Sequence, residues 1–131
     1  MIDKEFAEAE FYRFTESMDI ETDEQMLGDA DDVKSFNQTR NTIVKGIMTE
    51  RVTIDDKGQP TVHVADNKDV TFYEPKGSTI MAMDSKGKDR DIAKMFASME
   101  EMTRSARGTF GNMPMRDLKY CKALAVLFLA Q

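Results

Sequence analysis

The sequence comprises 131 residues, of which 40% are hydrophobic and 32% are charged, and its formal net charge is -6. This length fits one compact domain of about 100–150 residues. The excess of acidic side chains, with no long run of Lys and Arg, argues against general nucleic-acid binding. The longest apolar run, residues 123–130, is far shorter than the ~20 residues of a membrane-spanning helix. We therefore expect a protein that binds neither nucleic acid nor membrane.

The side chains that could support enzyme chemistry are few. Cys121 and His63 are each the only residue of their type, so neither a Cys/His zinc site nor an intrachain disulfide can form. The cluster Asp29, Asp31 and Asp32 lacks the glycine and the distal glutamate of a calcium loop. The motifs GxGxxG, GxxxxGK[ST], HExxH and GxSxG do not occur. The sequence predicts a non-enzymatic protein without a cofactor or metal, in a reducing cytoplasm.

Charge is distributed unevenly along the chain. Residues 1–34 hold twelve acidic and three basic side chains, a net charge of -9, whereas the other 97 residues hold fifteen basic and twelve acidic side chains, a net charge of +3. We therefore divide the chain into an acidic helical segment, residues 1–49, and a core domain, residues 50–131. Residues 86–122 carry nine basic and five acidic side chains. This complementary charge predicts a homo-oligomer formed by head-to-tail contacts.

The acidic segment is predicted to be helical. Ile2, Phe6, Phe14 and Met18 recur at spacings near three and four residues, which indicates an amphipathic helix over residues 3–18. Residues 22–25 have the form of a capping box with Thr22 as its first residue, so a second helix is expected there. Asp32 is expected to cap a third helix that ends near Gly46.

After residue 50 the spacing of apolar residues changes from the helical pattern to the alternation of a β-strand. Val52, Ile54, Val62 and Val64 alternate with polar residues on either side of the turn sequence 56–58, which predicts a β-hairpin over residues 51–65. Residues 70–73 form a third expected strand, which Pro75 ends. The sequence thus predicts a small antiparallel β-meander over about residues 51–73.

Two to three helices are expected after the meander. Ser78 is expected to cap a short helix through Met83. Asp89 or Asp91 is expected to cap a longer helix, with Gly108 as its C-cap glycine. The last helix is expected to begin near Pro114. The predicted fold class is therefore α+β, with helices on both sides of the meander in the chain order.

Methionine is frequent, with 11 residues in the chain. It adapts to irregular apolar surfaces, so a cluster of methionines can form a surface for varied partners. The alternative is that Met95, Met99 and Met102 fill the core at helical spacing. The last helix is apolar nearly all round from residue 123 to residue 130, and it must be buried in the core or against another chain. The predicted partner-binding residues are Met99, Met102, Met113, Met115, Leu127 and Phe128.

Three stretches together resemble the tail assembly chaperones of long-tailed bacteriophages. They are residues 70–75 (VTFYEP), residues 89–108, and residues 113–118 (MPMRDL) leading into residues 125–129. The resemblance covers about residues 50–131. It implies a non-enzymatic protein of the host cytoplasm that binds the tape-measure protein and helps to recruit tail-tube subunits. A structural tail or head-completion protein, or an acidic inhibitor that mimics nucleic acid, remains an alternative.

Overall fold

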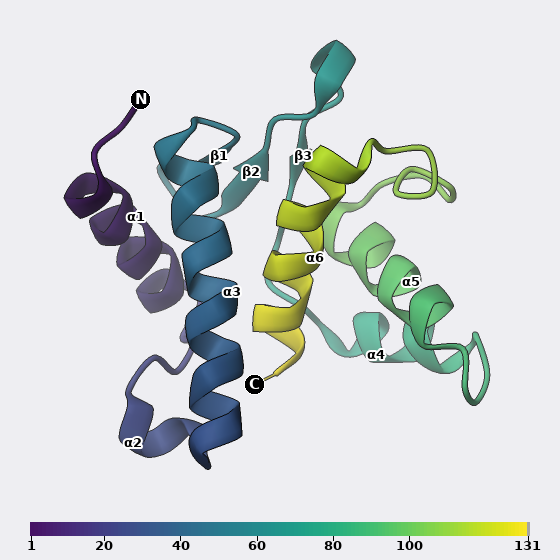
Figure 1. Cartoon of the computed structure of the whole chain (residues 1–131). Helices are drawn as coiled ribbons and strands as arrows, with labels where there is room; N and C mark the ends of the chain where they lie inside the picture. The colour runs from purple at the N-terminus through teal and green to yellow at the C-terminus, as the bar shows by residue number, and fades with distance from the viewer. Residues whose placement is uncertain (131) are drawn as a thin grey trace.

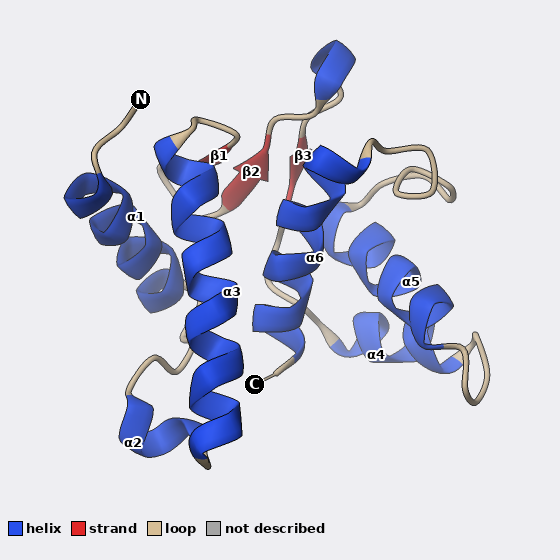
Figure 2. Cartoon of the chain, viewed as in Figure 1, coloured by secondary structure: helices blue, strands red, loops and turns tan. Residues whose placement is uncertain are grey.

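The structure is a computed structural model, and it describes residues 1–130. Three helices precede a three-stranded antiparallel sheet, and three helices follow it (Figure 2), which confirms the expected α+β fold. In chain order the elements are α1 (Lys4–Ser17), α2 (Glu24–Leu27), α3 (Ala30–Met48), β1 (Val52–Ile54), β2 (Pro60–Val62), the 3-10 turn η1 (Ala65–Asn67), β3 (Val70–Thr71), α4 (Gly77–Asp84), α5 (Asp91–Thr103) and α6 (Met115–Leu129).

The helices pack side by side across the molecule. α3 lies between α1 and α6, α5 packs on α6, and α4 packs on α5 (Figure 1). The sheet adjoins α1, α3 and α6 through β1 and β2. As a result α1 and the α4–α5 pair lie at opposite ends of the molecule. No helix among residues 1–130 is long and apolar enough to span a membrane.

The sheet follows the alternation expected for the meander. β2 is the central strand, and Val62 pairs with Val52 on one side and with Val70 on the other. The side chain of Asp55 shapes the hairpin turn, since its carboxylate accepts hydrogen bonds from the backbone N–H groups of Lys57 and Gln59, both at 2.9 Å. The third strand is shorter than expected. After Phe72 the backbone leaves the sheet, and the N–H of Tyr73 donates to the carbonyl of Met102 on α5.

The predicted helix over residues 3–18 is confirmed as α1, but the next two caps differ from the prediction. Asp23, not Thr22, caps α2, because its carboxylate accepts a hydrogen bond from the N–H of Gln25. Asp29, not Asp32, caps α3. The carboxylates of Asp29 and Asp32 each accept the other residue's N–H, so Asp32 forms the second half of a capping box.

The caps of α4 and α5 also differ from the prediction. Thr79, rather than Ser78, accepts a hydrogen bond from the N–H of Lys76 at the start of α4. Ser78 instead donates its hydroxyl to Glu101 at 2.6 Å, which links α4 to α5.

Neither proposed aspartate caps α5, since Arg90 occupies that position and Asp91 lies in the first turn. The helix ends at Thr103, before Gly108. Arg104 takes the left-handed conformation with φ 54°, and its guanidinium lies 3.9 Å from the centre of the Tyr73 ring. A residue other than glycine thus occupies the left-handed position at the end of the helix, and its side chain also makes a cation–π contact.

The acidic segment shares one hydrophobic core with the rest of the chain. Phe14 on α1 meets Phe128 on α6 edge to face, with ring centres 5.6 Å apart, and Phe72 stacks on Phe128 at 6.4 Å. Arg13 also joins α1 to the hairpin, where it donates to the carbonyls of Ile54 and Asp55. Residues 1–49 are therefore packed into the same body as residues 50–130, although they differ from them in charge.

Candidate protein-binding surface

One side of α6 is not covered by any other part of residues 1–130. Met115, Lys119, Lys122 and Val126 follow one another at spacings of three and four residues, so they lie along one side of the helix. All four are exposed, Met115 to 72% and Val126 to 41%. The other side chains of α6 fill the core beside α3, α5 and the sheet. This uncovered side faces the space next to α3.

Short side chains on α3 leave a shallow depression along that side. Thr39 and Val126 both line two neighbouring hollows of about 250 and 320 Å³. Ser35, Thr42 and Ala123 add further short side chains. We call this depression the α3–α6 groove and define it by Ser35, Thr39, Thr42, Met115, Ala123, Val126 and Ala130.

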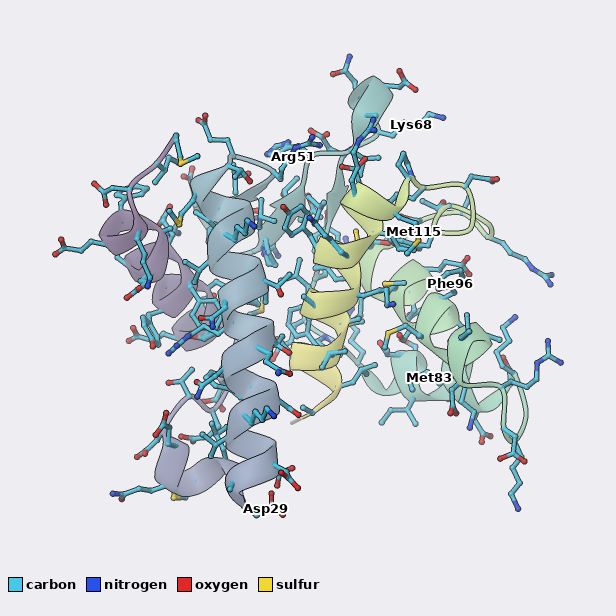
Figure 3. All side chains as sticks on the ribbon, viewed as in Figure 1. Asp29, Arg51, Lys68, Met83, Phe96 and Met115 are labelled. Atoms are coloured by element: carbon cyan, nitrogen blue, oxygen red, sulfur yellow. The ribbon has the colours of Figure 1, made fainter. Side chains whose placement is uncertain are left out.

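The groove has an apolar base and charged ends. Phe36 and Leu127 line the hollow at one end, together with Asp32. Lys119 and Lys122 line the hollow at the other end. Asp29, which Figure 3 places at the foot of α3, lies beyond the acidic end of the groove. An amphipathic helix with an apolar stripe and termini of opposite charge would match these features, since helices commonly bind in grooves of this kind.

The structure separates the predicted partner-binding residues into two groups. Met99, Met102, Leu127 and Phe128 are each no more than 5% exposed and belong to the core, although Leu127 also lines the hollow at the acidic end of the groove. Met113 is half-buried, and its sulfur lies 3.7 Å from that of Cys121. Met115 alone of the six is well exposed, and it lines the groove. The alternative interpretation therefore holds for Met99 and Met102, which fill the core.

Sequence reasoning identified only Met115 among the seven residues that define the groove, and it missed the others, Thr39 and Val126 among them. Their positions follow helical spacing, but their exposure depends on which side of α6 packs against α3. Cys121, the only cysteine in the chain, is buried. Burial raises the pKa of the Cys121 thiol to about 12. The thiol is therefore protonated and unreactive at neutral pH.

A buried ion pair positions the start of α6. Arg51 Nη1 lies 2.9 Å from Asp117 Oδ1, and the side chain of Asp117 is fully buried. The second oxygen of Asp117 accepts the N–H of Ala65, in η1, at 3.5 Å. In Figure 3 Arg51 lies above the strands, near the first turn of α6. The pair thus joins the hairpin, η1 and α6, and it sets where the exposed side of α6 begins.

The outer face of the sheet carries a hydrogen-bonded chain of three side chains. His63 Nε2 lies 2.8 Å from Thr53 Oγ1, and His63 Nδ1 lies 2.8 Å from Asp69 Oδ2. This order resembles that of a nucleophile, a base and an acid. The side chains of His63 and Asp69 are 38% and 46% exposed, and none of the three residues lines the groove. We interpret the chain as a cross-strand contact that stabilises the meander.

Within residues 1–130 no group of three or more His, Cys, Asp or Glu side chains is placed to hold a metal ion. Comparison of the chain with protein-family models, with curated proteins and with solved structures gave no match.

Proposed function

We propose that the protein is a non-enzymatic tail assembly chaperone that binds a helical segment of the tape-measure protein in the α3–α6 groove and helps to recruit tail-tube subunits. The observation that carries the binding mode is the groove itself, in which Met115 and Val126 are exposed beside the short side chains of α3. The resemblance of residues 50–131 supplies the identity of the client.

The geometry of the groove favours a helical client over an extended peptide. Its two walls are helices, so it runs along α3 and α6 and presents no free strand edge. An apolar stripe on a client helix would contact Val126 and Ala123, and its charged termini would meet Lys122 at one end and Asp32 at the other. A long helical protein such as a tape measure offers many such stripes in succession.

Substitutions that fill the groove test this proposal. We expect Thr39→Lys and Val126→Lys each to weaken binding of a tape-measure fragment by about tenfold or more, since about 1.4 kcal/mol of lost contact corresponds to a factor of ten. Asn41→Lys is the matched control, because it adds the same charge at an exposed position of α3 outside the two hollows. Binding is measured by isothermal titration, and folding by circular dichroism.

Wild-type affinity in both groove variants would overturn the binding mode. The alternatives have their own signatures in companion experiments. A structural tail or head-completion protein would be present in fixed number in purified particles. A nucleic-acid mimic would compete with duplex DNA for a basic target and would bind no tape-measure fragment.

A further inference from the structure

A second pair of surfaces, separate from the groove, lies at the two ends of the molecule. No other element of residues 1–130 covers the outer face of α1, which exposes Phe6 to 54% and Tyr12 to 41%. The start of α5 exposes Ile92 to 75%. Exposed aromatic and aliphatic side chains of this size mark a candidate contact surface when their surroundings are specific. The charge around each of these two faces is specific.

The α1 face borders an acidic hollow. Tyr12 lines a depression of about 360 Å³ together with three carboxylate side chains, and no basic side chain lines it. The carboxylates belong to Glu16, Asp19 and Glu21. Across residues 1–27 there are nine acidic and two basic side chains, a net charge of -7. We call Phe6, Tyr12, Glu16, Asp19 and Glu21 the acidic face.

The α5 face borders a basic hollow. Lys86, Arg90 and Arg107 surround a depression of about 240 Å³ whose base includes Ala93 and Phe96. The hollow contains one carboxylate, that of Glu100, which already accepts the N–H of Gly108 at 2.9 Å. We call Lys86, Arg90, Ile92, Phe96 and Arg107 the basic face.

The two faces cannot meet within one molecule. α1 packs on α3, α3 on α6, and α6 on α5, so two helices separate the acidic face from the basic face (Figure 1). In Figure 3 Phe96 and the α4–α5 pair lie on the side of the molecule opposite α1. Each face is therefore available to another molecule, and the matching face is present on every copy of this chain.

We propose that the acidic face of one copy binds the basic face of a second copy, so that the protein associates head to tail. Opposite charge orients the contact, and the apolar side chains Tyr12, Phe6 and Ile92 supply buried area. A heterologous contact of this kind produces a ring if its rotation closes and a filament if it does not. The contact leaves the α3–α6 groove of each copy uncovered, so this inference does not depend on the proposed function.

Charge reversal tests the contact in both directions. The wild-type protein should show a mass that rises with concentration at low salt and falls to the monomer in about 1 M NaCl, where the Debye length is only about 3 Å. The variant Glu16→Lys/Asp19→Lys has two basic faces, and the variant Lys86→Glu/Arg90→Glu has two acidic faces. Each variant alone should remain a monomer. An equimolar mixture of the two should associate again, because each variant then meets the face that complements it.

A matched control has the same change in net charge elsewhere. Asp31→Lys/Glu50→Lys alters two exposed positions at the two ends of α3, outside both faces, and it should associate like the wild type. Light scattering and sedimentation velocity report the mass, and circular dichroism confirms folding. The proposal is overturned if the wild type stays monomeric at low salt and high concentration, if either reversal variant associates alone, or if the mixture stays monomeric.

Discussion

Arg51 and Asp117 form an ion pair between residues that are 66 positions apart in the chain, with one charge fully buried and the other partly exposed. A carboxylate that is buried away from water needs a cation and hydrogen-bond donors to compensate its charge. For Asp117 the cation is Arg51, and a further donor is the N–H of Ala65. Asp117 also lies in the first turn of α6, where a negative charge interacts favourably with the helix dipole.

Removal of the Arg51 side chain should therefore destabilise the folded protein. Arg51→Ala is expected to lower the free energy of unfolding by about 1–3 kcal/mol, because it leaves a buried carboxylate without its cation. Denaturation in urea measures the loss. Arg116→Ala, at the exposed neighbour of Asp117, should change stability by less than about 0.5 kcal/mol. Equal losses in the two variants would show that the ion pair does not stabilise the fold.

Gly46 in α3 occupies a position where a side chain does not fit. A Cβ at this residue would lie 2.8 Å from Val52 Cγ2 and 2.9 Å from Tyr120 Cδ1. Gly46→Ala should therefore destabilise the protein by about 1–3 kcal/mol through overpacking, although alanine is the better helix former. The control is Gly77→Ala in α4, where a Cβ meets nothing within 4 Å. Gly77→Ala should be neutral or slightly stabilising. Thermal melts of the two variants measure the difference.

The loss of stability when a methionine is replaced by glutamine should depend on how deeply that methionine is buried. Met99→Gln and Met102→Gln place an amide in the core, so each should lower stability by about 1–3 kcal/mol. Met115→Gln should leave the melting temperature nearly unchanged, since its side chain is largely exposed. Met113→Gln should fall between these results because Met113 packs beside Cys121. Thermal melts of the four variants check this order, and a strongly destabilised Met115→Gln would contradict it.

The raised pKa of Cys121, about 12 in the folded protein against 9.0 for the ordinary thiol, predicts a loss of stability in alkali. Between about pH 9 and pH 12 the Cys121 thiol stays protonated in the folded protein, whereas in the unfolded chain it loses its proton. The free energy of unfolding should therefore be unaffected below about pH 9 and then fall by up to about 1.4 kcal/mol for each pH unit as the pH rises. Cys121→Ala should show a shallower decline over this range, as measured by urea denaturation. An identical decline would assign the effect to other groups.

Local sequence patterns predicted which helices and strands occur more accurately than the residues at which they begin and end. The hairpin was predictable because strand alternation and a turn sequence adjoin each other in residues 51–65. The start of α3 was not, because Asp29 and Asp32 are both good caps and only the folded backbone decides between them. α5 ends where Arg104 contacts Tyr73, 31 positions away in the chain, and such a contact leaves no local pattern.

The candidate surface was predictable only in part. The high methionine content of the chain led to Met115. The same reasoning also selected Met99 and Met102, although their helical spacing is equally compatible with a place in the core. Thr39 and Val126 come together because α3 and α6 pack against each other. Periodicity shows that a helix has an apolar side, but it does not show how much of that side a neighbouring helix covers.

The contact between Phe14 and Phe128 joins two parts of the core that are made at different times during synthesis of the chain. α1 leaves the ribosome before α6, yet the ring that covers Phe14 belongs to α6. Until α6 has emerged, Phe14 and Phe72 lack their shared neighbour, and the nascent chain carries unburied aromatic rings. Contacts between such distant positions also slow folding. We expect the protein to acquire its native core only after α6 has been released from the ribosome.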